Sequence, residues 1–283
     1  RSILTFPTKT WAQEPIAKIG DTPYESLKDA FYAAADGSTV TLLGNADIGE
    51  QLIDIWTKEG EKNLTLDLNG FSLTGTEQLI YVRIGGNLTV KGGTIGGPYA
   101  DNPCDIAIRT VGGKLNIENL TISNCRTGIL NDQEPLDGEM VKGELTIGSG
   151  VNISATERCI DNCEGKLTLT ALPILSWGED GRGITLGEDK VIHFAGEGIT
   201  ALPEGFKPIE IFAYGELPLV ITNGYADHVK SGSEVIDPAM LFVGEDDISL
   251  VLYEGEAMMT YGGIHHVSVT KGDEVKEYLS LIS

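Results

Sequence analysis

The feature that most constrains this sequence is a short strand motif that returns at a fixed interval. The segment 63–66, with the sequence NLTL, recurs as NLTV at 87–90. Self-similarity at a fixed interval of roughly 20 to 50 residues is typical of repeat architectures, in which each unit is one small group of helices or strands. The sequence therefore predicts a stack of similar units.

The same strand can be followed through most of the chain. Its copies begin at positions 40, 64, 88, 115, 145, 167 and 191, so the interval stays close to that between the first two. Tight glycine turns introduce several copies, as at Gly85-Gly86 and Gly112-Gly113, where a side chain would not fit easily. Two further short strands accompany each copy, for example 71–73 and 81–83, so the unit contains three strands.

Three short strands that alternate apolar and polar residues cannot bury their apolar side alone. Stacked at about 4.7–4.9 Å, each unit pairs its backbone with the units above and below and completes a shared core. We therefore predict an all-β parallel β-helix with three short strands per coil. An antiparallel sandwich is the alternative, and it explains the density of strands but not their regular recurrence.

The charge balance restricts the partners that the chain can bind. With 20 Lys and Arg against 42 Asp and Glu, the formal net charge is −22. Nucleic acids and anionic membranes attract clustered positive charge, so we expect neither as a partner. No apolar run approaches the roughly 20 residues of a membrane-spanning helix, and we expect any signal peptide to have been removed or never present. This composition is compatible with a secreted or cell-surface protein.

One helix is predicted ahead of the first coil, over 26–35. Ser26 is placed to cap it, with Asp29 three residues on. Four apolar residues share one face of this helix: Leu27, Ala30, Phe31 and Ala34. We expect the helix to cover the open end of the core, and a separate partner-binding helix is the alternative. The expected regions are an N-terminal strand and capping helix (1–36), the coils of the β-helix (37–206), and irregular C-terminal coils with a cap (207–283).

The run from Ala17 to Gly75 resembles a known group of domains. It contains AKIGDTPYESLKDAFYAAADGSTVTLLGNADI, followed by NLTLDLNGFSLTG, and looks like the start of pectin-lyase-like, right-handed parallel β-helix domains in large secreted or wall-attached proteins of gut bacteria. The likeness extends through NLTVKGGTI at 87–95 and, more loosely, to 207–209 and beyond. The resemblance implies a right-handed, single-stranded β-helix, export and a surface role, and it carries over no catalytic residue.

Pectate lyases and polygalacturonases share this fold, so their catalytic motifs provide a test. Inverting glycosidases need two carboxylates roughly 6.5–9.5 Å apart, and the resemblance directs us to Asn-Thr-Asp, Asp-Asp, Gly-His-Gly and Arg-Ile-Lys. Only Asp-Asp occurs, as Asp246-Asp247, without its partner motifs. A lyase would need calcium carboxylates and a basic residue that accepts the proton. We therefore predict no catalytic residue, no metal site and no cofactor.

The third strand of each coil supplies the residues of our predicted glycan site. Arg83, Arg109 and Asp161 fall at what the repeat indicates are equivalent, outward positions, and Tyr81 is placed to stack on a sugar ring. Guanidinium and carboxylate groups would then contact sugar hydroxyls or a uronate. The alternative is a ladder of exposed polar side chains that binds nothing, because single exposed aromatic and charged residues are frequent on protein surfaces.

Other reactive residues have structural interpretations. The insertion 131–141, NDQEPLDGEMV, is acidic enough to hold a cation, but its spacing does not match the calcium loop D-x-[DN]-x-[DN]-G, which favours a solvated loop. His193 lies within a repeat strand and is interpreted as a residue of the coil face. Four cysteines fall near the third strand, and we interpret them as free structural thiols rather than disulfides: Cys104, Cys125, Cys159 and Cys163.

These observations favour a non-catalytic module over an enzyme. We predict a secreted or cell-surface β-helix that binds glycans or a host surface, or that acts as a structural spacer. The alternative is a polysaccharide lyase or glycoside hydrolase with a diverged site around Arg83, Arg109 and Asp161, acting on uronate-containing or mucin-type glycans. The sequence leaves the ligand and the oligomeric state open.

Overall fold

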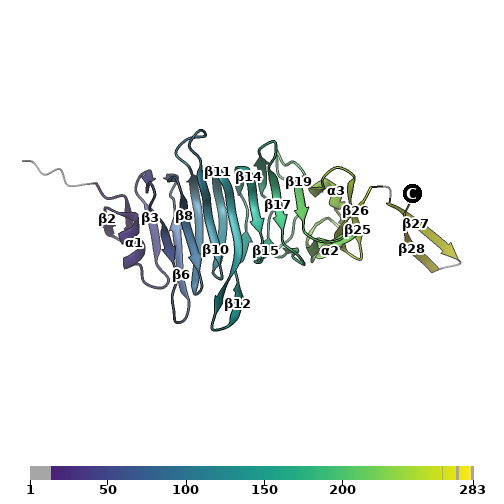
Figure 1. Cartoon of the computed structure of the whole chain (residues 1–283), viewed down its shortest axis with the longest axis horizontal. Coiled ribbons are helices and arrows are strands. Elements are labelled where there is room, and N and C mark those ends of the chain that lie inside the picture. The colour runs from purple at the N-terminus through teal and green to yellow at the C-terminus, as the bar shows by residue number, and fades with distance from the viewer. Residues whose placement is uncertain (1–13, 263, 272–273, 282–283) are drawn as a thin grey trace, which may run out of the picture.

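The chain folds into a parallel β-solenoid of about seven turns. The computed structural model describes residues 14–262, 264–271 and 274–281. Residues 1–13 of the predicted N-terminal region (1–36) lie outside them. Figure 1 shows the coils stacked along the long axis of the molecule. Successive copies of the repeat strand pair in register, Leu64 with Leu88 and Leu88 with Leu115. The predicted parallel β-helix is confirmed.

Each coil contributes strands to three faces. The first face contains β3 (Thr39–Leu42), β6 (Lys62–Asp67), β9 (Gly86–Gly96), β11 (Lys114–Leu136), β13 (Glu144–Ile147), β15 (Lys166–Leu169), β18 (Ile192–Phe194) and β21 (Thr222–Asn223). The second face contains β4 (Ala46–Asp47), β7 (Ser72–Thr74), later parts of β9 and β11, β14 (Asn152–Asn162) and β16 (Ile174–Trp177). The third face contains β5 (Ile53–Ile55), β8 (Gln78–Arg83), β10 (Cys104–Val111), the ends of β11 and β14, β17 (Arg182–Leu186), β19 (Ile209–Ala213) and β24 (Phe242–Val243).

The core consists of rows of aliphatic side chains, with one residue from each coil. One row runs through the first face, and all its members are at most 4% exposed: Leu64, Leu88, Leu115, Leu145, Leu167 and Ile192. Burying one such side chain contributes about 1.5–3 kcal/mol relative to leaving it in water. Every second side chain of a strand enters this core, which explains why apolar and polar residues alternate along each strand.

The predicted capping helix is α1 (Leu27–Ala33). The Ser26 hydroxyl accepts a hydrogen bond from the Asp29 backbone N–H at 3.3 Å, and Leu27, Ala30 and Phe31 are buried. Two short strands precede the helix, β1 (Ala17–Ile19) and β2 (Thr22–Tyr24), and β1 pairs antiparallel with both β2 and β3. The N-terminal segment therefore closes one edge of the first coil as well as the end of its core.

One corner of the coil requires a left-handed backbone. Four successive coils have such a residue between the first and second faces. In chain order these residues are Asn69, Gly92, Asn119 and Gly150, with φ values of 51°, 78°, 46° and 70°. Glycine and asparagine tolerate this conformation better than other residues. This corner explains why Asn or Gly follows the repeat strand in each of these coils.

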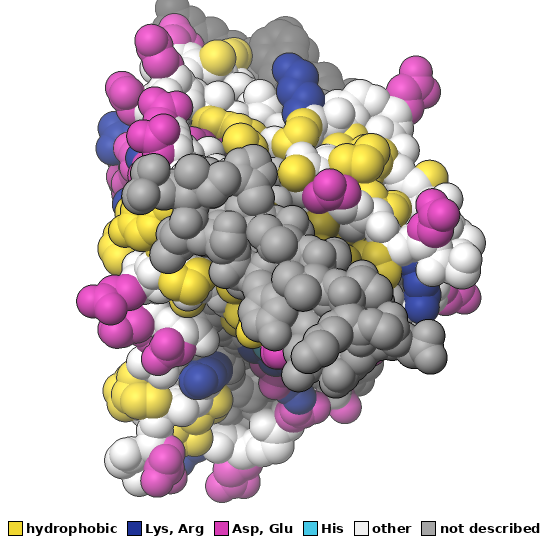
Figure 2. Space-filling model, turned by 90° about the vertical axis from the view of Figure 1, so that its right-hand side faces the viewer, with side chains coloured by type: hydrophobic (Ala, Val, Ile, Leu, Met, Phe, Trp, Pro, Cys, Tyr) yellow, Lys and Arg dark blue, Asp and Glu magenta, His cyan; other side chains and the backbone are white. Residues whose placement is uncertain are grey.

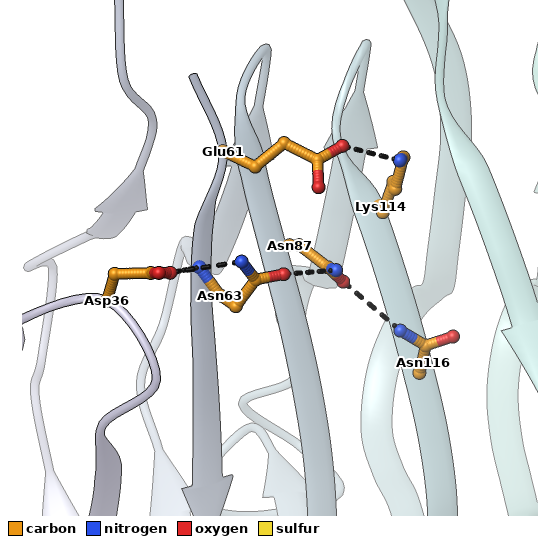
Figure 3. Close-up of polar contacts among 6 residues, drawn as sticks. All are labelled: Asp36, Glu61, Asn63, Asn87, Lys114 and Asn116. Carbon is orange, nitrogen blue, oxygen red and sulfur yellow. Dashed lines mark hydrogen bonds and ion pairs between the residues drawn. The ribbon is translucent and has the colours of Figure 1, made fainter. Parts of the chain in front are cut away.

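A ladder of asparagine side chains lies along the first face (Figure 3). Asn63 accepts a hydrogen bond from the Asn87 amide at 2.7 Å, and Asn87 accepts one from the Asn116 amide at 3.3 Å. Asn63 in turn donates its amide to the Asp36 carboxylate at 3.0 Å, and its backbone N–H donates to the same oxygen at 2.7 Å. A parallel ion pair, Lys114 to Glu61 at 2.6 Å, lies beside the ladder. These bonds join coils that are far apart in sequence.

The insertion at 131–141 forms a β-hairpin, not a loop. The end of β11 pairs antiparallel with β12 (Glu139–Lys142), with Glu134 opposite Val141 and Leu136 opposite Glu139. Figure 1 shows the hairpin projecting from the side of the solenoid. The insertion is exposed at its tip, as expected of the predicted solvated acidic loop, and it is ordered as a hairpin because the two arms satisfy each other's backbone hydrogen bonds.

Antiparallel pairs and short helices follow the last coils. The region predicted as irregular C-terminal coils with a cap (207–283) continues the coils through β19, β21 and β24, and its two short helices were not predicted. The additional elements are β20 (Leu219–Val220), α2 (Tyr225–His228), β22 (Lys230–Ser231), β23 (Glu234–Val235), α3 (Pro238–Leu241), β25 (Ile248–Tyr253), β26 (Glu256–Tyr261), β27 (Ile264–Lys271) and β28 (Glu274–Leu281).

Acidic side chains are spread over the surface of this region. Figure 2 views the C-terminal end of the solenoid and shows Asp and Glu side chains distributed over it, with few Lys or Arg between them. Over the described residues, none of the helices has the length and apolar character that crossing a membrane requires.

Candidate functional site

The polar side chains of the third face are brought together by the register of the coils. In β8 the buried Ile80 is followed by Tyr81, which points outward, as does Arg83 at the end of the strand. Tyr81 lies opposite Arg109 of β10 on one side and opposite Asp54 of β5 on the other. Six residues form a cluster here, which we call the third-face patch: Asp54, Trp56, Tyr81, Arg83, Arg109 and Glu134.

Two aromatic rings and two guanidinium groups form the centre of the patch. The guanidinium carbon of Arg109 lies 5.1 Å from the centre of the Tyr81 ring, and that of Arg83 lies 5.5 Å from the same ring. Arg83 also lies 5.9 Å from the centre of the Trp56 ring, which is 53% exposed. Each such cation–π contact contributes about 0.5–1 kcal/mol at an exposed site. The rings and guanidinium groups therefore hold one another in place.

Two carboxylates bind Arg83 from different parts of the chain. Glu134, at the base of the β11–β12 hairpin, accepts hydrogen bonds from Nη2 of Arg83 at 2.6 Å and from Nε at 3.2 Å. Asp54 lies 3.8 Å from Nη1. The hydrogen bond to Glu134 raises the pKa of Arg83, and burial raises the pKa of the Asp54 carboxyl, opposed in part by the charge of Arg83. Arg83 therefore has its charge satisfied within the protein.

Arg109 differs from the other arginines in this respect. Four of the five arginines in the described residues have a carboxylate within 4.0 Å: Arg83, Arg126, Arg158 and Arg182. Arg109 has none among these residues, and its Nε is buried without a hydrogen-bond partner. The guanidinium of Arg109 is therefore the donor in the patch that is not already used by a protein carboxylate.

The structure corrects two of the predicted positions. Arg83 lies opposite Val111 and not opposite Arg109, so the two arginines are on neighbouring rows of the face. Asp161 does lie on the row of Arg109, but Leu130 separates them. The Asp161 side chain is also only 7% exposed.

The buried Asp161 carboxylate has its own partners. It forms an ion pair with Arg158 at 2.9 Å and accepts a hydrogen bond from the Cys163 thiol at 3.2 Å. The structure thus brings together Tyr81, Arg83 and Arg109 of the four predicted residues. Asp161 belongs to a separate, internal group of contacts.

Sequence reasoning missed Asp54, Trp56 and Glu134. The signal for the first two lay in the repeat, since IDIW at 53–56 aligns with IYVR at 80–83 when the coils are placed in register. Glu134 carried no comparable signal, because its approach to Arg83 depends on how the insertion folds.

A second aromatic and arginine cluster lies at the other end of the third face. The Arg182 guanidinium carbon lies 5.4 Å from the centre of the Phe212 ring, and Phe212 contacts Tyr214 edge to face, with ring centres 5.0 Å apart. Arg182 is bound to Glu245 at 2.6 Å. A cavity of about 490 Å³ adjoins these residues. This cluster has no arginine without a carboxylate partner.

The remaining reactive side chains do not join the patch. All four cysteines are free, and burial raises the pKa of Cys159 to about 11 and that of Cys163 to about 12. His193 lies on the first face, where burial lowers its pKa. Across residues 14–262 and the two C-terminal strands, we find no group of three or more His, Cys, Asp or Glu side chains arranged to hold a metal ion.

Comparisons of the chain with protein-family models, with curated proteins and with solved structures gave no match.

Proposed function

We propose that the chain is an exported β-helix module, secreted or held at the cell surface, that binds glycans through the third-face patch without cleaving them. The observation that carries this proposal is the half-exposed Trp56 ring beside Tyr81 and the unpaired guanidinium of Arg109. Sugars offer C–H faces that pack on aromatic rings and hydroxyls that bind guanidinium and carboxylate groups. The patch provides both kinds of contact within one small area.

The proposed location rests on the sequence. The resemblance of residues 17–75 to pectin-lyase-like domains of secreted or wall-attached proteins of gut bacteria supports export and a surface role. The net charge of −22 also supports a partner that is neither nucleic acid nor an anionic membrane.

A glycan array tests the proposed function. The labelled chain is applied to the array, and the glycans that bind are then titrated against the wild type, Trp56→Ala and Arg109→Ala by calorimetry. We expect both substitutions to weaken binding at least tenfold, because each removes a group that contacts the sugar directly. Tyr99→Ala is the matched control, since Tyr99 is 68% exposed and lies outside the patch.

Glycan cleavage is the second candidate, and one observation favours it. Asp54 and Glu134 lie on either side of Arg83, and the raised pKa of Asp54 suits a general acid. Assays for reducing ends and for unsaturated products, on uronate-containing and mucin-type glycans, distinguish the two candidates. If the wild type releases product and Asp54→Asn does not, the proposed function changes from binding to catalysis. If the chain shows no binding and no turnover, a structural spacer remains as its function.

A further inference from the structure

We propose that the outer edge of β5 binds an extended polypeptide strand, and that residues 2–6 of the same chain supply this strand. The proposal concerns how the first coil is completed. Asp54 and Trp56 lie both in the groove beside this edge and in the third-face patch, so the hydrogen-exchange test measures backbone pairing directly and uses no glycan.

The first argument is the pairing of β5. This strand begins the third face and pairs on one side only, with β8, through Ile53 opposite Ile80 and Ile55 opposite Val82. No strand of the described chain pairs with its other side. Such an edge presents backbone N–H and C=O groups at the spacing of an extended chain, and another strand is the partner that satisfies them.

The second argument is the groove beside this edge. A cavity of about 560 Å³ lies between β5 and α1, and on the β5 side its lining runs without a break from Leu52 to Trp56. Tyr32 of α1 and Trp56 line it, and these large side chains are 91% and 53% exposed. Exposed aromatic side chains beside an unpaired strand edge mark a surface that binds a polypeptide.

The first face shows how the N-terminal segment closes such an edge. There β1 pairs antiparallel with β3, with Ala17 opposite Leu42 and Ile19 opposite Val40. The first coil is therefore closed at its first face and open at its third face. The residues that precede β1 are the nearest in sequence that can close the third face in the same way.

The sequence of residues 1–13, RSILTFPTKTWAQ, suits the groove. Residues 2–6, SILTF, are rich in the β-branched and aromatic types that favour strands. Pro7 has no backbone N–H, so it ends a run of strand pairing. The segment contains Arg1 and Lys9 and no acidic residue, although the whole chain has 42 Asp and Glu residues. A basic segment is attracted to the acidic body of the protein.

The connection is long enough to reach the groove. Glu14 lines a smaller cavity together with Leu27 and Gln51, and Gln51 directly precedes the first residue that lines the β5 groove. The seven residues 7–13 span about 23 Å when extended, and the five residues 52–56 occupy about 17 Å, both at about 3.3 Å per residue. Residues 2–6 can therefore lie alongside β5.

Hydrogen exchange of the full chain tests the proposal. Leu4→Pro removes a backbone N–H in the middle of the proposed strand, whereas Thr8→Pro places a second proline beside Pro7, outside it. We expect the groove-facing amides of residues 52–56 to exchange at least tenfold faster in Leu4→Pro than in the wild type or Thr8→Pro. Amides of β8 should exchange at the same rate in all three proteins. A synthetic peptide of residues 1–13, added to Leu4→Pro, should restore the slow exchange.

Two results would overturn the proposal. Equal exchange rates at residues 52–56 in all three proteins, with no effect of the peptide, would show that the segment does not pair with β5. A wild-type dimer that Leu4→Pro converts to a monomer, measured by light scattering, would assign the strand to a second copy of the chain.

Discussion

Arg109 of β10 and Tyr81 of β8 lie directly opposite each other in neighbouring coils, with the Arg109 guanidinium carbon 5.1 Å from the centre of the Tyr81 ring. Two regular strands place the two residues opposite each other, and the ring contact and the burial of Arg109 Nε restrict the arginine side chain. A site fixed in this way loses little conformational entropy when a ligand binds. The third-face patch is therefore preorganised.

Arg83 and Arg109 should differ in their effect on stability. Arg83→Ala leaves Glu134, whose side chain is 17% exposed, without its ion-pair partner, and a partly buried charged group without a partner costs about 1–3 kcal/mol. Arg109→Ala removes no ion pair, so we expect the free energy of unfolding to fall by less than about 1 kcal/mol. Denaturant unfolding measures both values. Equal losses would contradict the contacts assigned to Glu134.

Asp36 should stabilise the fold in a pH-dependent way. Hydrogen bonds from the Asn63 backbone and side chain lower its pKa below the usual 3.8. The folded state thus favours the ionised form, so the contribution is complete above about pH 4 and is lost as the pH falls through the lowered folded pKa. We expect Asp36→Ala to reduce the melting temperature at pH 6 and to have less effect near pH 2. An equal loss of melting temperature at pH 6 and near pH 2 would contradict this role of Asp36.

The cysteines should resist alkylation in the folded protein. Cys104, Cys125 and Cys159 are buried, and Cys163, with a pKa of about 12, has a thiolate fraction of roughly one in 10⁴ at pH 8. We expect fewer than one iodoacetamide adduct per chain after an hour at pH 8, and four after unfolding in guanidinium, counted by intact mass. Rapid native labelling would contradict the burial of these thiols.

A cavity in the core row should be costly. Leu88→Ala removes a side chain packed between Leu64 and Leu115, and substitutions of this kind cost about 2–5 kcal/mol. Thr89→Ala, the next residue and on the outer side of the same strand, should cost less than about 1 kcal/mol. Chemical denaturation of the two variants compares the inner and outer sides of one strand. Similar losses would mean that Leu88 does not pack as the register indicates.

The coils and the capping helix were predictable because local chemistry specifies them. Every copy of the repeat strand alternates apolar and polar residues, and Gly85 and Gly112, predicted as turn glycines, have φ values of 76° and 71°. Ser26 caps α1 as predicted because a hydroxyl at that position needs no tertiary partner to bind the Asp29 N–H. Such features depend on a few neighbouring residues, and the sequence contains all of them.

The patch was only partly predictable because it depends on register between coils. The repeat indicated that Arg109 is equivalent to Arg83, whereas β10 is shifted along β8 so that Arg83 meets Val111 and Arg109 meets Tyr81. The shift arises in the connection between β9 and β10, which carries no repeat motif. Glu134 reaches Arg83 through a hairpin whose shape the spacing of its acidic residues did not indicate.

The asparagine ladder has a direction. Each amide, from Asn116 to Asn87 to Asn63, donates toward the N-terminal end, and the series ends on the Asp36 carboxylate, which can only accept. Because Asn63 must turn its N–H₂ toward this anion, its oxygen faces Asn87, and the same choice is then imposed on each following residue. One negative charge at the first coil thus sets the polarity of amides three coils away, and inverting Asn63 or Asn87 would place like dipole ends in contact on both sides.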